Sequence, residues 1–284
     1  MRLIACFLLF FSSIVWSEGP VVSLKGCDEA GFFCMFQAVL GMLDAYDKEE
    51  ISGVEINFGK SGYYYDESMG ENWWNYYFEP FRMHIDGSSY RISFQEKAYD
   101  YYLRGSSKLS KGRCNFLINK YMRIQPKILQ EVKEFLRRNI KDSNFIGVHY
   151  RGTDKMKGES TFLSVKSAVL RIKQKLSCMK KPSGYRIFVA TDDQSFLDHM
   201  KTEFGKRICY FEMERSTNNL PIHMYGASSG YIKGKMALLD CLVLSKSVFL
   251  FRTSSNLSNV SLVFNPSLES VLLNAALWKE GDRE

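Results

Sequence analysis

The sequence is poor in proline and cysteine, with six and seven of them among its 284 residues. Because 45% of the residues are apolar and 24% are charged, the chain is not a disordered tail, a collagen-like repeat or a small disulfide-dense module. Lys and Arg number 38 against 31 Asp and Glu, and this modest excess does not indicate a nucleic-acid-binding protein. A few cations around one anionic ligand would account for it. The length fits one large domain or two modest ones.

Residues 1–17 have the pattern of a cleaved signal peptide. Arg2 precedes the apolar run Leu3–Phe11, and the small side chains of Val15 and Ser17 suit a cleavage site. A membrane-spanning helix needs about 20 apolar residues, which neither this run nor any later segment provides. A buried N-terminal helix is the alternative. We predict a mature chain without a membrane span in the secretory pathway (ER or Golgi lumen), the periplasm or the exterior.

An oxidising compartment permits disulfide bonds. After cleavage six cysteines remain: Cys27, Cys34, Cys114, Cys178, Cys209 and Cys241. Fifteen pairings are open to six cysteines, and the sequence does not choose among them. Cys27 and Cys34 are close in sequence and form the first pair to test. Because the cysteines lack the spacing of zinc ligands, we expect no metal site.

The chain divides near residue 141. In the first part, residues 18–141, Gly31–Asp44 is apolar at helical spacing and Val54–Phe58 alternates like a short strand. Ile128–Ile140 is a clear amphipathic helix. Between these elements the pattern is irregular, whereas the second part, residues 142–284, has a regular rhythm of strands and helices.

An aromatic stretch stands out in the first part. It includes Trp73, Trp74 and Tyr77, with Asn72 and Asn75 among them. Aromatic rings stack on the apolar faces of sugars, and amide side chains bond their hydroxyl groups, so the stretch suits a carbohydrate-binding surface. The alternative is that these rings form a hydrophobic core.

Strands and helices alternate in the second part, which predicts a parallel sheet with helices on both faces. The expected strands are Phe145–Tyr150, Arg186–Ala190, Arg207–Phe211, Val248–Phe251 and Val271–Asn274, and the expected helices are Phe162–Leu176, Ser195–Phe204 and Tyr231–Leu244. In such sheets ligands bind beyond the carboxyl ends of the strands.

Polar residues follow three of these strands. His149–Lys155 come after the first strand with Glu159 beyond them, Thr191–Asp193 after the second, and Thr253–Asn256 after the fourth. No strand is followed by a dinucleotide fingerprint, a P-loop or a nucleophilic serine elbow. An Arg with serine hydroxyls and helix N-terminal amides suits a pyrophosphate.

Structural alternatives exist for several of these residues. His149 fits a buried structural histidine, and Thr153 and Asp154 fit turn caps. Asp192 and Asp193 precede a helix, so one of them fits a helix N-cap. Lys155 fits a solvated face. Arg151 has no comparable alternative, because it follows an apolar strand at the functional edge of the sheet.

Three ordered segments resemble one enzyme family. GVHYRGTDKMKGE, FVATDDQSFL and GKMALLDCLVLSKSVFLFRTSSN are similar to the α1,6-fucosyltransferases, and the O-fucosyltransferases share the first segment. The resemblance covers about residues 144–258. It implies a GT-B fold with two Rossmann-like domains, in which residues 18–141 face the acceptor and residues 142–284 bind the donor. It also implies transfer of fucose from GDP-fucose to a glycan or glycoprotein with inversion and without a metal or other cofactor.

Roles follow from the resemblance by position. Arg151 corresponds to the arginine that grips the donor pyrophosphate, Glu159 to the catalytic base and Lys155 to an acceptor-side lysine. The other implied donor-binding positions are His149, Asp154, Asp192, Asp193, Asp240, Ser254, Ser255 and Asn256. The acceptor would meet Trp73, Trp74 and Tyr77.

One position departs from the family pattern. The family often has a second arginine where this chain has Gly152. This departure leaves open a nucleotide-sugar-binding protein without turnover, or a transferase that uses another nucleotide sugar. Asn256 and Asn259 also begin glycosylation sequons, and we expect Asn256 to be unmodified because a glycan there would obstruct the donor.

Overall fold

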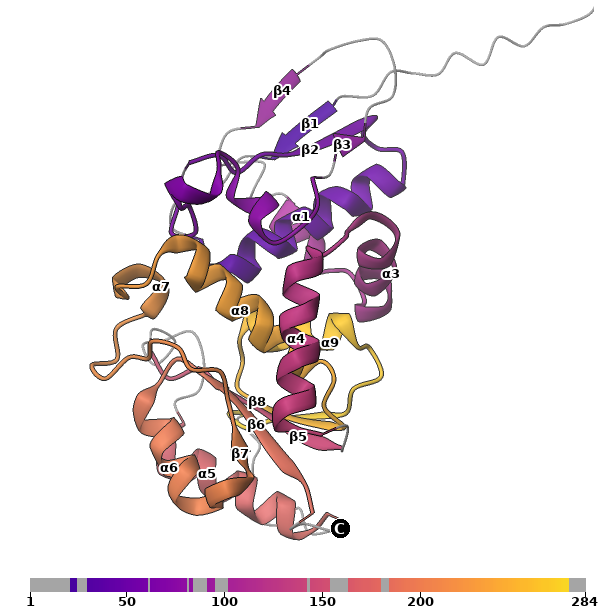
Figure 1. The fold of residues 1–284 in the computed structure, drawn as a ribbon. Coiled ribbons are helices and arrows are strands. Elements are labelled where there is room, and N and C mark those ends of the chain that lie inside the picture. Colours follow the sequence, from indigo (N-terminus) through magenta and orange to yellow (C-terminus); the bar gives the residue numbers. More distant parts are fainter. Residues whose placement is uncertain are drawn as a thin grey trace, which may run out of the picture.

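The computed structural model describes residues 21–24, 30–60, 62–80, 82–83, 91–94, 102–141, 144–153, 163–179 and 184–275. The predicted signal peptide and Cys27 lie outside these residues, so both predictions stay predictions. The described chain forms two separate sheets, with several helices between them and further helices beyond the larger sheet (Figure 1).

The larger sheet has five parallel strands. They are β5 (Phe145–Tyr150), β6 (Arg186–Thr191), β7 (Ile208–Cys209), β8 (Phe249–Arg252) and β9 (Ser270–Leu272), in the order β7-β6-β5-β8-β9. Every residue of the central strand β5 is buried. Strands buried on both faces read as continuous apolar runs, and for this reason the sequence predicts them well. The predicted parallel sheet is confirmed, although β7 is shorter than expected.

Helices cover both faces of this sheet. Helices α5 (Val165–Ser177) and α6 (Gln194–Phe204) lie on one face, and α4 (Pro126–Asn139) and α8 (Gly230–Leu244) on the other, where α9 (Asn256–Phe264) packs against α8. Alternate residues of β5 and β6 enter two different hydrophobic cores, one on each side. The sheet therefore presents only its strand ends to a ligand.

The smaller sheet belongs to the first part of the chain. Its strands are β1 (Val21–Leu24), β2 (Gly53–Ile56), β3 (Arg82–Met83) and β4 (Arg91–Phe94), ordered β3-β2-β1-β4 with β3 antiparallel to β2. Helix α1 (Phe32–Asp47) connects β1 to β2. Only β2 was expected from the sequence, because strands of two to four residues are too short to show a period of two.

Short elements complete the described fold. They are the single turns η1 (Glu67–Met69), η2 (Trp73–Tyr76) and η4 (Gly205–Arg207), the helical residues 102–106, and the helices α3 (Lys111–Tyr121) and α7 (Ile222–Tyr225).

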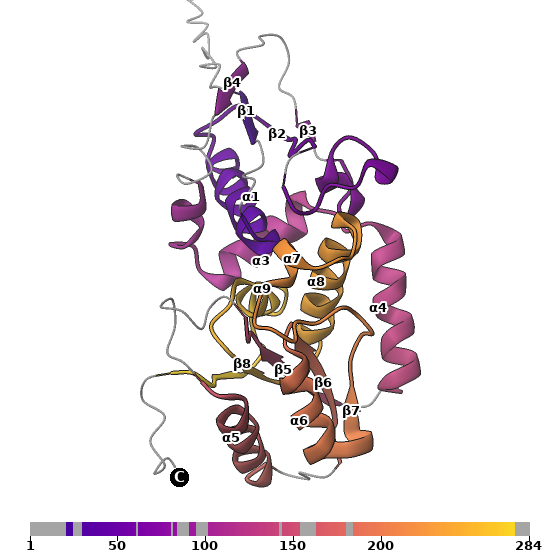
Figure 2. The same ribbon diagram turned by 90° about the vertical axis from the view of Figure 1, so that its left-hand side faces the viewer.

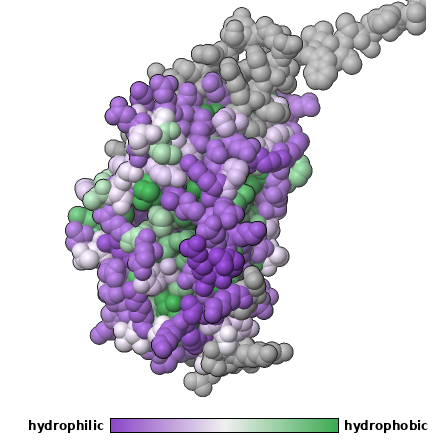
Figure 3. Space-filling view, viewed as in Figure 1, coloured by the Kyte–Doolittle hydropathy of each residue, from purple (hydrophilic) through white to green (hydrophobic). Residues whose placement is uncertain are grey.

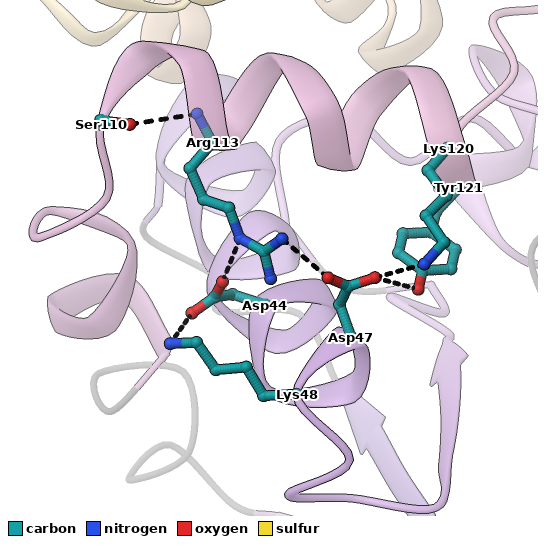
Figure 4. A network of polar contacts seen from close by, with 7 residues as sticks. All are labelled: Asp44, Asp47, Lys48, Ser110, Arg113, Lys120 and Tyr121. Atoms are coloured by element: carbon teal, nitrogen blue, oxygen red, sulfur yellow. Dashed lines mark hydrogen bonds and ion pairs between the residues drawn. The ribbon is translucent and has the colours of Figure 1, made fainter.

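Ion pairs join the end of α1 to α3 (Figure 4). The guanidinium of Arg113 contacts both Asp44 and Asp47, with Nε 2.7 Å from Oδ1 of Asp44 and Nη1 2.7 Å from Oδ2 of Asp47. Lys48 and Lys120 contact the remaining oxygens of these carboxylates at 2.6 Å each. Hydrogen bonds from Lys120 and its neighbouring tyrosine, together with Arg113, hold the pKa of Asp47 well below its usual range. Every charge of this network has a partner.

The aromatic stretch forms a core, and this corrects the expectation of an acceptor surface. The side chains of Trp73, Trp74 and Tyr77 are 2%, 1% and 0% exposed. Trp74 stacks on Phe78 with ring centroids 4.2 Å apart. Asn72 caps η2 and donates to the backbone of β2, so its amide serves the fold and does not face solvent sugars. A ring without an exposed face cannot stack on a sugar.

Tyr77 fastens this aromatic core to α8. Its hydroxyl lies 3.2 Å and 3.0 Å from the carbonyl oxygens of Gly230 and Tyr231, and its ring stacks on Tyr231. A Cβ at Gly234 would lie 2.3 Å from the Tyr77 hydroxyl oxygen, so glycine alone permits this approach. The first part of the chain therefore packs tightly on the second, and the predicted division at residue 141 stays a prediction.

Cysteine pairing was left open by the sequence. Among the described residues, no disulfide bond joins Cys34, Cys114, Cys178, Cys209 or Cys241 to one another. The proposed partner of Cys34, Cys27, lies outside it. A disulfide bond therefore stays a prediction for that pair alone.

Candidate active site

The order of the five-stranded sheet defines where a ligand should bind. From β5 the chain continues to β6 and β7 on one side and returns to β8 and β9 on the other. The crevice outside the carboxyl ends of β5 and β8 is thus the switch point of the sheet, the position where such folds bind ligands. Two hydrogen bonds tie the loops there: Thr253 N donates to His149 O at 3.0 Å, and Arg151 N donates to Thr253 Oγ1 at 2.9 Å.

A cavity of about 340 Å³ opens at this point. Its walls come from the start of α1, from α7 and α8, and from the loops after β5, β6 and β8. Six of the positions implied by the resemblance line it: His149, Arg151, Asp192, Asp240, Ser255 and Asn256. Residues from three strand ends and from α8 therefore meet in one site, as the sequence predicted.

Arg151 is held by a carboxylate beside the cavity. Its Nε lies 3.1 Å from Oδ2 of Asp192, and its side chain is 23% exposed. Asp192 also accepts hydrogen bonds from Gly152 N at 3.0 Å and Thr153 Oγ1 at 2.7 Å. Asp192 thereby fixes both the loop after β5 and the guanidinium. An arginine fixed in this way presents its fork to an anion without losing further side-chain freedom.

Asp193 has a different role from its neighbour. Its Oδ1 accepts a hydrogen bond from Phe196 N at 2.9 Å and caps α6, and it does not line the cavity. The alternative reading of an N-cap is therefore right for this residue. Ser254 is also absent from the lining; its backbone N donates to Asn274 Oδ1.

The packing of Asp193 explains the missing second arginine. A Cβ at Gly152 would lie 2.3 Å from Oδ2 of Asp193. Any side chain at position 152 would displace this carboxylate and with it the cap of α6. Gly152 is therefore part of the local packing.

Two buried titratable groups face the cavity. His149 is 3% exposed, burial lowers its pKa to about 3, and its Nδ1 has no hydrogen-bond partner among the described residues. Asp240 is 4% exposed, and burial raises its pKa to about 7 against the lowering effect of the nearby charge of Arg215. No hydrogen bond to the Asp240 carboxyl comes from the described part of the chain. Buried polar groups are normally hydrogen-bonded, so both groups are available to form a hydrogen bond with a ligand.

Two helix N-termini end at the cavity without side-chain caps. The N-cap residues Gly31 of α1 and Ser255 of α9 make no side-chain cap hydrogen bond. Asn256 Nδ2 lies 2.8 Å from Sγ of Cys34, which joins the two helix starts. Ser110, Ser164, Asp193 and Ser229 cap α3, α5, α6 and α8, whereas α4 and the short α7 also begin without a side-chain cap. Uncapped N-termini suit an anion.

Part of the predicted site lies outside the described residues. Asp154, Lys155 and Glu159 belong to the segment 154–162. The implied catalytic base and acceptor-side lysine therefore stay predictions.

The family follows from a comparison with known sequences. Residues 113–261, more than half of the chain, match the family model described as alpha-(1,6)-fucosyltransferase N- and catalytic domains. The chain belongs to the α1,6-fucosyltransferase family. No curated protein sequence gives a significant match.

Solved fucosyltransferases share the fold of this family member. NodZ α-1,6-fucosyltransferase soaked with GDP-fucose is 13% identical with a TM-score of 0.60, covering 87% of this chain and 93% of that one. NodZ from Bradyrhizobium is 14% identical with a TM-score of 0.59, covering 86% and 92%. POFUT1 in complex with GDP-fucose is 14% identical with a TM-score of 0.52, covering 90% and 97%. These are GT-B enzymes, and the predicted GT-B-like α/β fold is confirmed.

Several cavity residues of this fucosyltransferase were missed by sequence reasoning. Phe33 and Cys34 at the start of α1, Tyr64, Glu214 and Lys233 all line the cavity. The only sequence signal for the first two was Gly31 before an apolar helical run. The others come from irregular segments or from the polar positions of a helix, where spacing says nothing about a ligand.

The described part of the fucosyltransferase contains no cluster of three or more His, Cys, Asp or Glu residues that would hold a metal ion. None of its helices has the length and apolar character required to cross a membrane.

Proposed function

We propose that this fucosyltransferase moves fucose from GDP-fucose to a hydroxyl group of a glycan or glycoprotein, with inversion and without a metal ion. The family assignment supports the reaction class, and the fold is shared with NodZ soaked with GDP-fucose and with POFUT1 in complex with GDP-fucose. Two parts of the cavity suit the donor, one for its base and one for its diphosphate.

The base of the donor fits the buried end of the cavity. Guanine carries N1–H and an amino group side by side, and one ionised carboxylate accepts from both. Asp240 supplies a buried carboxyl with no competing donor among the described residues, and two donated hydrogen bonds would favour its ionised form. His149 is neutral at pH 7, since burial lowers its pKa, and so its ring offers one donor and one acceptor nitrogen.

The diphosphate fits the part of the cavity near Arg151. The guanidinium, held by Asp192, and the open N-termini of α1 and α9 all favour negative charge. When GDP leaves, negative charge grows on the β-phosphate. Preorganised donors stabilise that charge more than water does, because they do not have to reorient during the reaction.

The transfer itself is a single displacement. The acceptor oxygen forms a bond to C1 of fucose, the bond from C1 to the β-phosphate oxygen breaks, and GDP departs with the electron pair. A base must take the proton of the acceptor hydroxyl. The resemblance assigns this role to Glu159.

The observation that carries the proposal is the buried carboxyl of Asp240, to which no described residue donates a hydrogen bond, in the same cavity as the guanidinium of Arg151 held by Asp192. Calorimetric titration with GDP and a transfer assay with GDP-fucose over an acceptor array test it. GDP binding together with fucose transfer is expected. Absence of GDP binding and of transfer to every acceptor would overturn it.

A variant separates an enzyme from a binding protein. In an enzyme, Glu159→Gln abolishes transfer and leaves GDP binding intact, because the base does not contact the nucleotide. In a binding protein the variant changes nothing, since there is no transfer to lose. Competition of bound GDP by a panel of GDP- and UDP-sugars then identifies the donor. Displacement by a UDP-sugar but not by GDP-fucose would contradict the proposed donor.

The secretory compartment is also a proposal, supported by residues 1–17. Asn256 lines the cavity, whereas Asn259 is exposed on α9. If the chain passes through a glycosylating compartment, we expect any glycan at Asn259, with Asn256 unmodified. Peptide mass spectrometry of the secreted protein measures the occupancy, and full occupancy at Asn256 would contradict the donor site.

A further inference from the structure

Positive charge is concentrated in one segment of the chain. Residues 104–141 contain eleven Lys and Arg but only two Glu, a net charge of +9, whereas the whole chain has +7. The rest of the chain is therefore slightly acidic. The segment contains α3, α4 and the turn between them, all within the described residues.

The cavity does not explain this charge. The sequence interpretation attributed the functional part of the charge to a few cations around one anionic ligand. Among its described lining residues, Arg151 and Lys233 are outnumbered by Asp192, Glu214 and Asp240. Helix α8 lines the cavity with one face and contacts α4 with another, so α4 lies behind it. Figure 2 shows α4 at the outer edge of the molecule.

The exposed cations of this segment outnumber its acids, although Arg123 donates to the carbonyl oxygens of Asn119 and Met122 and Lys127 lies over the ring of Tyr231. Glu131 and Glu134, the acids of α4, are already paired with Lys235 and Arg138. No described carboxylate forms an ion pair with the other exposed cations, which are Arg104, Lys108, Lys111, Arg123, Lys127, Lys133, Arg137 and Lys141. A hydrophilic band covers α4 in the centre of the face shown in Figure 3.

Two of these cations lie one helical turn apart. Lys133 and Arg137 are four residues apart on α4, a spacing at which side chains lie about 5–6 Å apart and like charges destabilise a helix. Lys141 lies past the helix end with φ 55°, so it does not continue this row of side chains. The pair Lys133 and Arg137 is therefore favourable for an anion that carries more than one charge.

We propose that the exposed cations of residues 104–141, with Lys133 and Arg137 on α4 at their centre, bind an acidic polysaccharide chain. The charges of such a chain repeat along its length, so one chain can contact several of these cations. Arg and Lys recognise sulfate and carboxylate groups directly. The site is separate from the donor cavity and does not depend on the proposed transfer.

Other polyanions fit these cations less well. Single-stranded nucleic acids are bound by stacking bases on aromatic rings. Helix α4 exposes no such ring, and on α3 the exposed ring of Phe116 is in contact with the cations of Arg113 and Lys120. A membrane surface needs an apolar face to insert, whereas Leu129 is the one large apolar side chain exposed on α4. Both are outcomes that the test must distinguish.

Heparin is the probe for the test. Binding of the full chain is measured by surface plasmon resonance against heparin, desulfated heparin, phosphatidylserine vesicles and a single-stranded oligonucleotide. We expect heparin to bind best and Lys133→Glu/Arg137→Glu to weaken it by roughly tenfold or more. The matched control is Lys166→Glu/Lys175→Glu, which reverses two exposed cations of α5, one of them also in the last helical turn. We expect it to bind like the wild type.

The milder variant Lys133→Gln/Arg137→Gln should bind heparin with intermediate strength, and unchanged melting temperatures confirm that the variants fold. GDP binding, measured in parallel, should be the same in all of them. The proposal is overturned if the α5 control weakens heparin binding equally, or if vesicles or the oligonucleotide bind as tightly as heparin. Wild-type protein that does not bind heparin at all would also overturn it.

Discussion

The carboxylates at the end of α1 and the carboxylate in the cavity are opposites in their surroundings. Asp44 and Asp47 each contact two basic side chains, and the pKa of Asp47 is held low. Asp240 is buried without a hydrogen bond from the described residues, and its pKa is raised to about 7. The first arrangement stabilises the fold, whereas the second destabilises it and is compensated when a ligand binds. Fold and site are therefore separable by their electrostatics.

The largest expected effect is on the affinity for GDP. Arg151→Ala removes the charged donor to the diphosphate, so we expect the affinity for GDP to fall about 100-fold or more, as measured by calorimetry. Arg151→Lys keeps the charge but loses the planar guanidinium, so its affinity for GDP should lie between those of the wild type and Arg151→Ala. Retention of wild-type affinity in Arg151→Ala would show that the guanidinium does not contact the ligand.

Replacing Arg113 is expected to lower stability and to leave GDP binding unchanged. Arg113→Met leaves Asp44 and Asp47 each short of one partner in their half-buried site, and this lowers the free energy of unfolding by about 2 kcal/mol. GDP affinity should not change. The control Arg138→Met breaks an exposed pair with Glu134 and should cost less than about 0.5 kcal/mol. Equal losses in the two variants would remove the distinction between a network and a surface pair.

The two regions should also respond to pH in opposite directions. Asp240 has a raised pKa in the folded state, so the stability it contributes is present below about pH 4 and is lost as the pH rises towards 7. Asp47 has a lowered pKa, so its contribution is present above about pH 4 and is lost as the pH falls further.

Urea unfolding at pH 5 and pH 8 measures the first effect. We expect Asp240→Asn to gain on the order of 1–2 kcal/mol relative to the wild type between these values. Asp47→Asn should show no such gain there and should instead lose its deficit below pH 4. A constant difference between Asp240→Asn and the wild type would mean that this carboxyl is not desolvated.

The smallest effect concerns the neighbouring aspartates. Asp193→Ala removes the cap of α6 and should lower the free energy of unfolding by about 1 kcal/mol without changing GDP affinity. Asp193→Asn, which still accepts a hydrogen bond, should keep most of the stability. A loss of GDP affinity in both variants would place Asp193 back among the donor-binding residues.

The five-stranded sheet was predictable because the signal for each strand lies within a short stretch of sequence. β5 is an unbroken apolar run, and the polar residues after it, such as Arg151, mark its carboxyl end. In the structure β5 and β8 are neighbours in the sheet, so their carboxyl ends lie side by side. The sequence predicted that either Asp192 or Asp193 could be a helix N-cap. Only the hydrogen bond from Phe196 N to Asp193 in the structure shows which one it is.

Long-range packing was not predictable in this way. Whether Trp73 is a core ring or a sugar platform depends on the α1 and α8 residues that cover it, which are far away in the sequence. The strands β1, β3 and β4 are too short to show a pattern. The start of α1 reaches the cavity only because the two parts of the chain pack together. The partners of the surface cations are equally invisible in sequence.

The most direct test of this account is a calorimetric titration of GDP into the wild type, Asp240→Asn and Asp44→Asn. The two variants make the same chemical change, one in the cavity and one in the α1–α3 network. We predict that Asp240→Asn weakens GDP binding about tenfold or more and that Asp44→Asn binds GDP like the wild type. Wild-type affinity in Asp240→Asn would contradict this prediction, because it would show that the buried carboxyl does not bind the nucleotide.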